Sequence, residues 1–187
     1  ICGPDHLFPY SPNRIYTPPD ALLPNYFALL ETLGVDRAVL VQPSIYGTDN
    51  RALINALQQF PTKLRGVAVV DEGISENEIQ QLHAVGVRGV RCNIVDLADG
   101  KGILPMDNLS LLANKIAPWG WHLELLMHVN EFPDIYSQFR NFPVEIVLGH
   151  YGYQPTRLGI NTKGFQDYLA MMREGRAWAK FTAPYRI

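Results

Sequence analysis

The strongest constraint on this chain is a regular alternation of two kinds of segment along its 187 residues. Short apolar stretches rich in β-branched residues alternate with longer amphipathic stretches that begin and end at typical helix signals. The apolar stretches predict strands buried on both faces, as in a parallel sheet. They cover residues 35–43, 64–70, 87–95, 122–129, 144–151 and 177–183.

The amphipathic stretches predict one helix beside each strand. The third of them begins at Ser75 with Glu78 three residues later, which is the spacing of a capping box. Because the connections are short, strand and helix form βαβ units and the sheet is expected to be parallel. The predicted helices cover residues 20–33, 49–60, 75–85, 106–118, 132–141 and 163–174.

Six strands fit either an open doubly wound sheet or most of a closed barrel. No G-x-G-x-x-G turn follows the first strand, which disfavours a nucleotide-binding open sheet. A closed barrel needs eight strands, and the chain begins with a proline-rich loop and ends without a helix after its last strand. We therefore expect an α/β fold, a (β/α)₈ TIM barrel that forms a single domain over residues 1–187 and lacks its first and last strands.

Composition points to a small-molecule partner. With 47% hydrophobic residues and a net charge of −2, the chain shows no sign of disorder, of a nucleic-acid surface or of a polybasic membrane contact. No apolar run reaches the roughly 20 residues that a membrane span needs. We expect Cys2 and Cys92 to be reduced thiols in a cytoplasmic protein. The sequence does not indicate an oligomeric state.

Polar side chains occur near the carboxyl ends of five predicted strands. An unpaired buried polar group costs about 1–3 kcal/mol, so each of them needs a reason. Active sites of (β/α)₈ barrels lie at this rim, and we expect these side chains to form a pocket for a small anion there. They are Gln42, Ser44, Arg91, Asn93, Glu124, His128, His150, Lys180 and Thr182.

Several of these residues allow two interpretations. The guanidinium of Arg91 suits two-pronged binding of a substrate carboxylate, or else it pairs with a neighbouring acid. Glu124 is a buried acid, a partner that orients a histidine, or one half of a salt bridge to Lys180. His150 is either a functional or a structural histidine, and His128 is a site or a loop residue.

The loop that follows the first strand also has two interpretations. Its Ser44 and backbone N–H groups can present donors to an anion at a helix N-terminus. Alternatively, residues 44–50 form an ordinary turn capped by Asp49 or Thr48.

A set of ordered motifs lies at residues 41–50, 65–71, 86–93, 120–122, 147–152 and 178–182. In their order and spacing, these motifs resemble the 2-pyrone-4,6-dicarboxylate lactonase group of the amidohydrolase superfamily. By this resemblance they would correspond to strands 2 to 7 of a barrel of the metallo-dependent hydrolase type.

The resemblance implies hydrolysis of a lactone or similar ester of a small carboxylated molecule, such as one from aromatic degradation, without a covalent intermediate. In that group an aspartate on the last strand activates water, and an H-x-H pair and a later histidine polarise the carbonyl. His150 resembles the later histidine, and the other groups would lie outside this chain. Members of this lactonase group work without a cofactor. The alternative is that this protein binds a divalent zinc or manganese ion, with His150 as a ligand.

The resemblance also implies a substrate site. Tyr16, Ser44, Arg91 and Arg186 resemble residues that contact carboxylates, and the predicted site adds Asn93, Glu124 and His128 to them.

Three positions depart from the pattern of the group. Asp96-Leu97 replaces a second arginine, Leu126 replaces a tyrosine, and Gly149 replaces an aspartate that would support His150. The first two changes remove polar contacts, so we expect a different and less acidic substrate. Two other functions remain open: a metal-dependent decarboxylase of the same superfamily, or a barrel that binds a ligand without chemistry.

Overall fold

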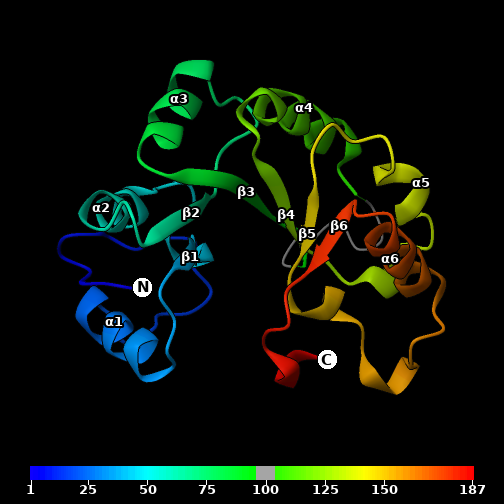
Figure 1. Cartoon of the computed structure of the whole chain (residues 1–187), viewed down its shortest axis with the longest axis horizontal. Coiled ribbons are helices and arrows are strands. Elements are labelled where there is room, and N and C mark those ends of the chain that lie inside the picture. The colour runs from blue at the N-terminus through cyan, green and yellow to red at the C-terminus, as the bar shows by residue number, and fades with distance from the viewer. Residues whose placement is uncertain (96–103) are drawn as a thin grey trace. The chain divides into compact units, whose positions relative to one another are not determined.

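The computed structural model describes residues 1–95 and 104–187, and its helices and strands alternate along the chain (Figure 1). Contacts divide the chain into two compact units, residues 1–89 and 90–187. Strand β3 (Val87–Asn93) crosses the boundary between them. Asp96 and Leu97, where the resemblance leads one to expect an arginine, lie outside the described residues.

Unit 1 begins with helix α1 (Leu23–Thr32) and is built around the parallel strands β1 (Ala38–Val41) and β2 (Leu64–Ala68). Helix α2 (Arg51–Gln59) connects them, and helix α3 (Glu76–Ala84) leads from β2 to β3. This is the βαβ arrangement that the alternation predicts.

Glycine 66 explains how closely α2 packs on β2. A Cβ atom at this position would lie 2.7 Å from Cδ1 of Leu57 on α2. A side chain at this position would therefore force Leu57 to move, and the glycine lets the helix lie this close without such a shift. The helix covers this face of the strand pair with Leu53 and Leu57, both of which are buried.

Unit 2 contains the parallel strands β4 (His122–Leu126), β5 (Ile146–Leu148) and β6 (Ala177–Ala179), in that order across the sheet. The register places Glu124 of β4 opposite Val147 of β5, and Val147 opposite Trp178 of β6. Side chains at Glu124 and on β6 can therefore approach one another across β5.

Three helices accompany these strands. Helix α4 packs on β4, and α6 packs on both β6 and α5. Their bounds are Met106–Ile116 for α4, Ile135–Phe139 for α5 and Lys163–Arg173 for α6.

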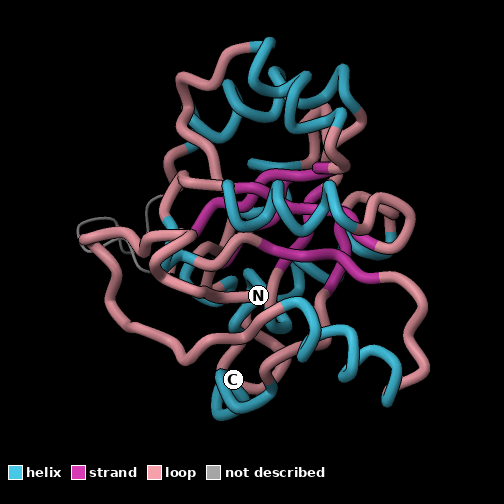
Figure 2. Tube along the Cα trace, turned by 90° about the vertical axis from the view of Figure 1, so that its left-hand side faces the viewer, coloured by secondary structure: helices cyan, strands magenta, loops and turns pink. Residues whose placement is uncertain are grey.

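The predicted helices and strands are confirmed, as is the capping box in which Ser75 accepts a hydrogen bond from the Glu78 N–H and the Glu78 carboxylate accepts one from Ser75. The predicted strand ends are wrong. β1, β5 and β6 end before their polar residues, β4 contains Glu124 but ends before His128, and much of the chain between elements is loop or turn (Figure 2). Most of the candidate site residues therefore lie in loops after the strands, where strand alternation does not set their direction.

Asn50 ties α2 to the end of β2. Its carboxamide accepts a hydrogen bond from the Val69 N–H (3.2 Å) and donates one to the Val69 carbonyl (2.8 Å), as a neighbouring strand would. A second donated bond reaches the Thr48 carbonyl at 3.0 Å. Because the Asn50 side chain takes the place of a strand, it satisfies backbone groups that would otherwise be buried and unpaired.

Replacing Asn50 by alanine is expected to lower the free energy of unfolding by about 2–4 kcal/mol, because both backbone groups of Val69 lose their partners. Asn55→Ala is the matched control, since Asn55 is an exposed residue of the same helix. Urea denaturation measures the free energy of unfolding of both variants. Equal stabilities for the two variants would contradict the role assigned to Asn50.

In the described residues, no helix combines the length and the apolar character that crossing a bilayer requires. Cys2 and Cys92 are free thiols. Burial raises the pKa of the Cys92 thiol to about 11, so this thiol is protonated at neutral pH and is a poor nucleophile.

Candidate active site

The turn that follows β5 has an uncommon backbone conformation. His150, Tyr151 and Tyr153 have φ angles of 51°, 57° and 50°, in the left-handed region that side chains other than glycine rarely adopt. Gly152 between them has a φ of 66°. Each such residue costs on the order of 1–3 kcal/mol, and conformations of this kind concentrate at functional sites. The turn therefore marks His150 independently of any motif.

Surrounding contacts fix this turn. The Gly152 N–H donates to the Gly149 carbonyl at 2.9 Å, and the Tyr151 N–H donates to the Lys180 carbonyl after β6 at 3.2 Å. The buried ring of Tyr153 has its centroid 5.1 Å from that of His150. These contacts hold the imidazole in one place at the carboxyl end of β5.

Gly152 provides a test of how tightly the turn is packed. A Cβ atom there would lie 2.7 Å from Cγ1 of Val129, whereas a Cβ at Gly175, which has a similar φ of 70°, would meet no atom within 4 Å. Gly175→Ala should cost about 1–2 kcal/mol of stability from strain alone. Gly152→Ala should cost about 1–3 kcal/mol more because of the clash. Thermal unfolding compares the two variants, and equal losses would show that the turn is loosely packed.

His150 is held in its neutral form. Its Nδ1 lies 2.8 Å from Oγ1 of Thr182. Burial is the main cause that lowers the His150 pKa below its usual value, followed by the positive charges of Lys180 and Arg186; a hydrogen bond to the backbone of Thr182 and the charge of Glu124 oppose them. Because free histidine titrates near pH 6.5, the imidazole is neutral at pH 7, with one donor and one acceptor nitrogen.

Glu124 and Lys180 form an ion pair across β5. The Lys180 ammonium lies 2.8 Å from Oε1 of Glu124. The Glu124 side chain is 3% exposed and that of Lys180 is 30% exposed. Of the three interpretations of Glu124, the structure supports the salt bridge. The pair places a cation beside His150, whose pKa it lowers.

His128 supports the same turn from the loop after β4. Its Nδ1 lies 3.2 Å from the carbonyl oxygen of Tyr153, and its ring centroid lies 5.1 Å from that of Tyr153. A carbonyl oxygen can only accept a hydrogen bond, so Nδ1 of His128 must carry the proton. His128 thus contacts Tyr153, which contacts His150.

Arg186 lies in the short turn η6 (Pro184–Arg186), which packs against the His150 turn. Its guanidinium carbon is 5.9 Å from the centre of the exposed Tyr185 ring. Arg91 and Asn93 lie on β3 and are half-buried. Unit 2 thus brings Glu124, His128, His150 and Arg186 together around one turn.

Ser44 and Tyr16 belong to unit 1. Ser44 begins the short turn η1 (Ser44–Tyr46) and is half-buried, and Tyr16 is a loop residue that is 47% exposed. The convergence of these two residues with those of unit 2 stays a prediction.

Two expectations for the loop after β1 are corrected. Gln42 does not face a pocket together with Ser44: it is 1% exposed and donates to the Asp49 carbonyl at 2.7 Å, which fixes the loop. Asn50 occupies the N-cap position of α2, but its side chain makes no capping hydrogen bond. The Asp49 carboxylate accepts the Arg51 N–H at 3.1 Å, in part as predicted, and also binds the Arg51 guanidinium; both interactions lower the Asp49 pKa.

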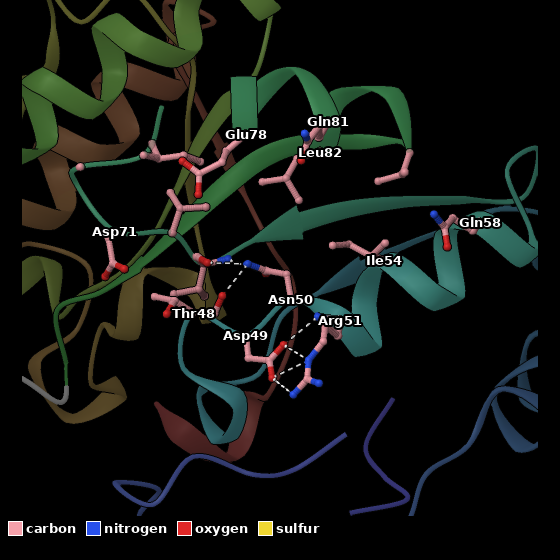
Figure 3. Close-up of a pocket in the computed structure, with 15 residues that line it drawn as sticks. Thr48, Asp49, Asn50, Arg51, Ile54, Gln58, Asp71, Glu78, Gln81 and Leu82 are labelled. Atoms are coloured by element: carbon pink, nitrogen blue, oxygen red, sulfur yellow. Dashed lines mark hydrogen bonds and ion pairs between the residues drawn. The ribbon is translucent and has the colours of Figure 1, made fainter. Parts of the chain in front are cut away.

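Unit 1 contains a cavity of about 730 Å³ between α2, α3 and the end of β2 (Figure 3). Polar residues including Asp49, Arg51 and Glu78 surround an apolar floor that includes Ile54 and Leu82. No predicted site residue lines this cavity. The left-handed turn at His150 and the predicted site residues around it belong to unit 2.

Comparison with known proteins decides the family. The family model described as "Amidohydrolase" matches residues 1–187. The chain is a member of the amidohydrolase family. As expected from the resemblance, its sequence and fold both agree with this family.

Curated relatives of this amidohydrolase include two lactone hydrolases. The chain is 39% identical over 189 residues to a 2-pyrone-4,6-dicarboxylate hydrolase of Comamonas testosteroni, covering all of this chain and 61% of the relative. It is 30% identical over 191 residues to a 4-sulfomuconolactone hydrolase of Rhizobium radiobacter, again over all of this chain and 62% of the relative. The chain therefore spans about three-fifths of the length of these relatives.

A solved structure agrees with the fold. A probable 2-pyrone-4,6-dicarboxylic acid hydrolase of Acinetobacter baumannii, crystallised with citric acid bound, superposes with a TM-score of 0.82 at 29% identity. The match covers 96% of this chain and 67% of that one. The amidohydrolase thus has the α/β fold that was predicted, in which β1 and β2, β4 and β5, and β5 and β6 pair in parallel.

The described residues of the amidohydrolase do not fit a metal centre by themselves. Within residues 1–95 and 104–187, no group of three or more His, Cys, Asp or Glu side chains is placed to hold an ion. The Nδ1 atom of His150 faces Thr182, and the Glu124 carboxylate is bound to Lys180. We derive no step through a metal.

Sequence reasoning placed Lys180 and Thr182 at the strand ends and offered Lys180 as a partner of Glu124, which the structure confirms. It gave Thr182 no role, because its partner His150 lies 32 residues away in the sequence. Tyr153 gave no signal, because an aromatic residue in a loop does not show in sequence that it packs between two histidines.

Proposed function

We propose that this amidohydrolase hydrolyses the ester bond of a small carboxylated lactone by attack of water on a polarised carbonyl. The observation that carries the proposal is the neutral imidazole of His150, held in a left-handed turn beside the cations Lys180 and Arg186. The names of the two curated relatives, both lactone hydrolases, support it.

The chemistry assigns a separate role to each group. A neutral imidazole can donate its single N–H to the lactone carbonyl oxygen, and this bond strengthens as negative charge develops there. Water adds to the carbonyl carbon and the ring C–O bond breaks; one proton of the water goes to the leaving ring oxygen and the other to solvent, so the products are a carboxylate and a hydroxyl group. No side-chain nucleophile is required, in keeping with the protonated thiol of Cys92.

We assign Arg186, Arg91, Asn93, Ser44 and Tyr16 to substrate binding. Guanidinium groups bind carboxylates in a two-pronged geometry, and Arg186 lies in a turn that packs on the His150 turn. Citric acid bound to the Acinetobacter baumannii relative supports a site for small carboxylates. Glu124 and His128 contribute through Lys180 and Tyr153, which contact them directly.

We further propose that the substrate is less acidic than the dicarboxylate in the name of the Comamonas testosteroni relative. Leu126 ends β4 and is buried, and its Cδ1 would lie 3.5 Å from a Cβ at Gly149, directly before His150. This places an apolar side chain beneath the catalytic turn, where it offers no hydrogen bond to a second carboxylate.

Mass spectrometry of the products tests the function. The full-length protein is incubated with 2-pyrone-4,6-dicarboxylate and with lactones that carry one carboxylate, in ¹⁸O-labelled water. We expect a ring-opened product that has gained one labelled water, formed faster from the monocarboxylates. A product that has lost carbon dioxide would instead establish the decarboxylase, and binding without turnover would establish a ligand-binding barrel.

The remaining assignments complete the proposal. We propose a single (β/α)₈ barrel domain of the metallo-dependent hydrolase type, of which residues 1–187 supply six strands. Hydrolysis should survive dialysis of the full-length protein against a chelator, whereas a zinc- or manganese-dependent decarboxylase would lose its activity. Free Cys2 and Cys92 support a cytoplasmic location.

A further inference from the structure

We propose that Thr182 is a positioning residue for His150: its hydroxyl donates to Nδ1 of the imidazole and so keeps the proton on Nε2, which faces the substrate. This inference rests on the proposed function for the role of His150. It goes beyond that function by naming the group that fixes the orientation and the tautomer of the imidazole.

The backbone brings the two residues together through one shared acceptor. The carbonyl oxygen of Lys180 accepts a hydrogen bond from the Tyr151 N–H at 3.2 Å and another from the Thr182 N–H at 2.9 Å. The two loops that follow β5 and β6 are therefore joined next to both side chains. Nδ1 of His150 then meets Oγ1 of Thr182 at 2.8 Å, which is a good hydrogen-bond distance.

Backbone strain occurs on both sides of this hydrogen bond. Among the described residues, left-handed φ angles outside glycine occur at His150, Tyr151, Tyr153 and Ala183. The first three form the turn that carries the imidazole, and Ala183, with φ 49° and ψ 55°, directly follows Thr182. Strain of this kind persists only where the surroundings enforce it, so its presence at both ends indicates that the fold holds this pair in contact.

The contact has a direct chemical consequence. A neutral imidazole carries its proton on only one nitrogen, and the partner of one nitrogen decides the state of the other. The residue directly before His150 is Gly149, which has no carboxylate side chain that could orient the ring. A hydroxyl from the next strand's loop can fill this role, and when it donates to Nδ1 the Nε2–H is left to donate to a carbonyl oxygen.

Two variants of the full-length protein separate this role from a structural one. Thr182→Val has nearly the same shape without the hydroxyl, and Thr182→Ser keeps the hydroxyl. Thr182 is exposed, so neither change should lower the melting temperature noticeably. We expect Thr182→Val to lower kcat about 10–100-fold with little change in KM, as loss of a supporting hydrogen bond does. Thr182→Ser should restore most of the activity. Thr156→Val, at an exposed threonine in the turn Thr156–Leu158, is the control.

The ¹⁵N chemical shifts of the His150 ring, assigned by their loss in His150→Asn, give a readout that needs no substrate. We expect a protonated Nε2 in the wild type and in Thr182→Ser, and mixed tautomers in Thr182→Val. A wild-type ring protonated at Nδ1, a Thr182→Val spectrum identical to wild type, or equal kcat losses in both variants would overturn the proposal. If the wild type hydrolyses no lactone, the proposed function fails while the ring spectra still decide whether Thr182 positions His150.

Discussion

Replacing His150 in the full-length protein by asparagine is expected to lower kcat for lactone hydrolysis by about 10²–10³-fold, the usual effect of removing a donor to a developing oxyanion. Asparagine tolerates the left-handed φ of 51° at this position better than most residues, so the turn should persist. The shorter side chain, however, cannot reach the position of Nε2. Steady-state kinetics with the best lactone substrate measures kcat for the variant and the wild type.

His150→Ala and His6→Ala complete this experiment. Alanine removes the imidazole and adds backbone strain, so His150→Ala should lose as much activity as His150→Asn and somewhat more stability. His6 is exposed in the opening loop of unit 1, and its replacement should leave kcat unchanged. If His150→Asn retained wild-type kcat, His150 would be a structural residue and the proposed mechanism would be wrong.

Removal of Lys180 is expected to destabilise the protein by about 3–5 kcal/mol, because Lys180→Met leaves the carboxylate of Glu124 buried without its charged partner. Removal of Glu124 should cost less. In Glu124→Leu the remaining ammonium, which is 30% exposed, can be solvated again. The double variant should be more stable than Lys180→Met alone, since it leaves neither charge in the site.

Chemical denaturation of the two single variants and the double variant measures the coupling between the side chains. We expect the wild type and the double variant to be the most stable proteins. Glu124→Leu should be less stable, and Lys180→Met the least stable. Additive losses in the double variant would mean that the ion pair across β5 contributes nothing to stability.

Much of the fold follows from local patterns in the sequence. Alternating apolar and amphipathic stretches identified each helix and strand, and the capping box at Ser75 located the start of α3 to the residue. The strand ends were predicted too late because the apolar pattern continues through Leu148-Gly149 into the loop, whereas β5 ends at Leu148. Left-handed angles at His150 and Tyr151 then turn the chain away from the strand direction.

The candidate site was less predictable, for a physical reason. Strand-end positions indicated His150 and Glu124, but tertiary contacts decide what each polar group binds. Gln42 shows the difference: its sequence position resembles that of a site residue, yet its side chain fixes a loop by donating to the Asp49 carbonyl. Likewise, no local signal predicts a left-handed φ at His150 or Tyr153, because packing on neighbouring loops enforces it.

A crystal structure of the full-length protein with a slowly hydrolysed carboxylated lactone would show where the substrate binds. We expect the lactone carbonyl oxygen within hydrogen-bond distance of Nε2 of His150, and the ligand carboxylate on Arg186 or Arg91. A ligand bound instead in the cavity between α2 and α3, away from the His150 imidazole, would show that His150 does not polarise the carbonyl.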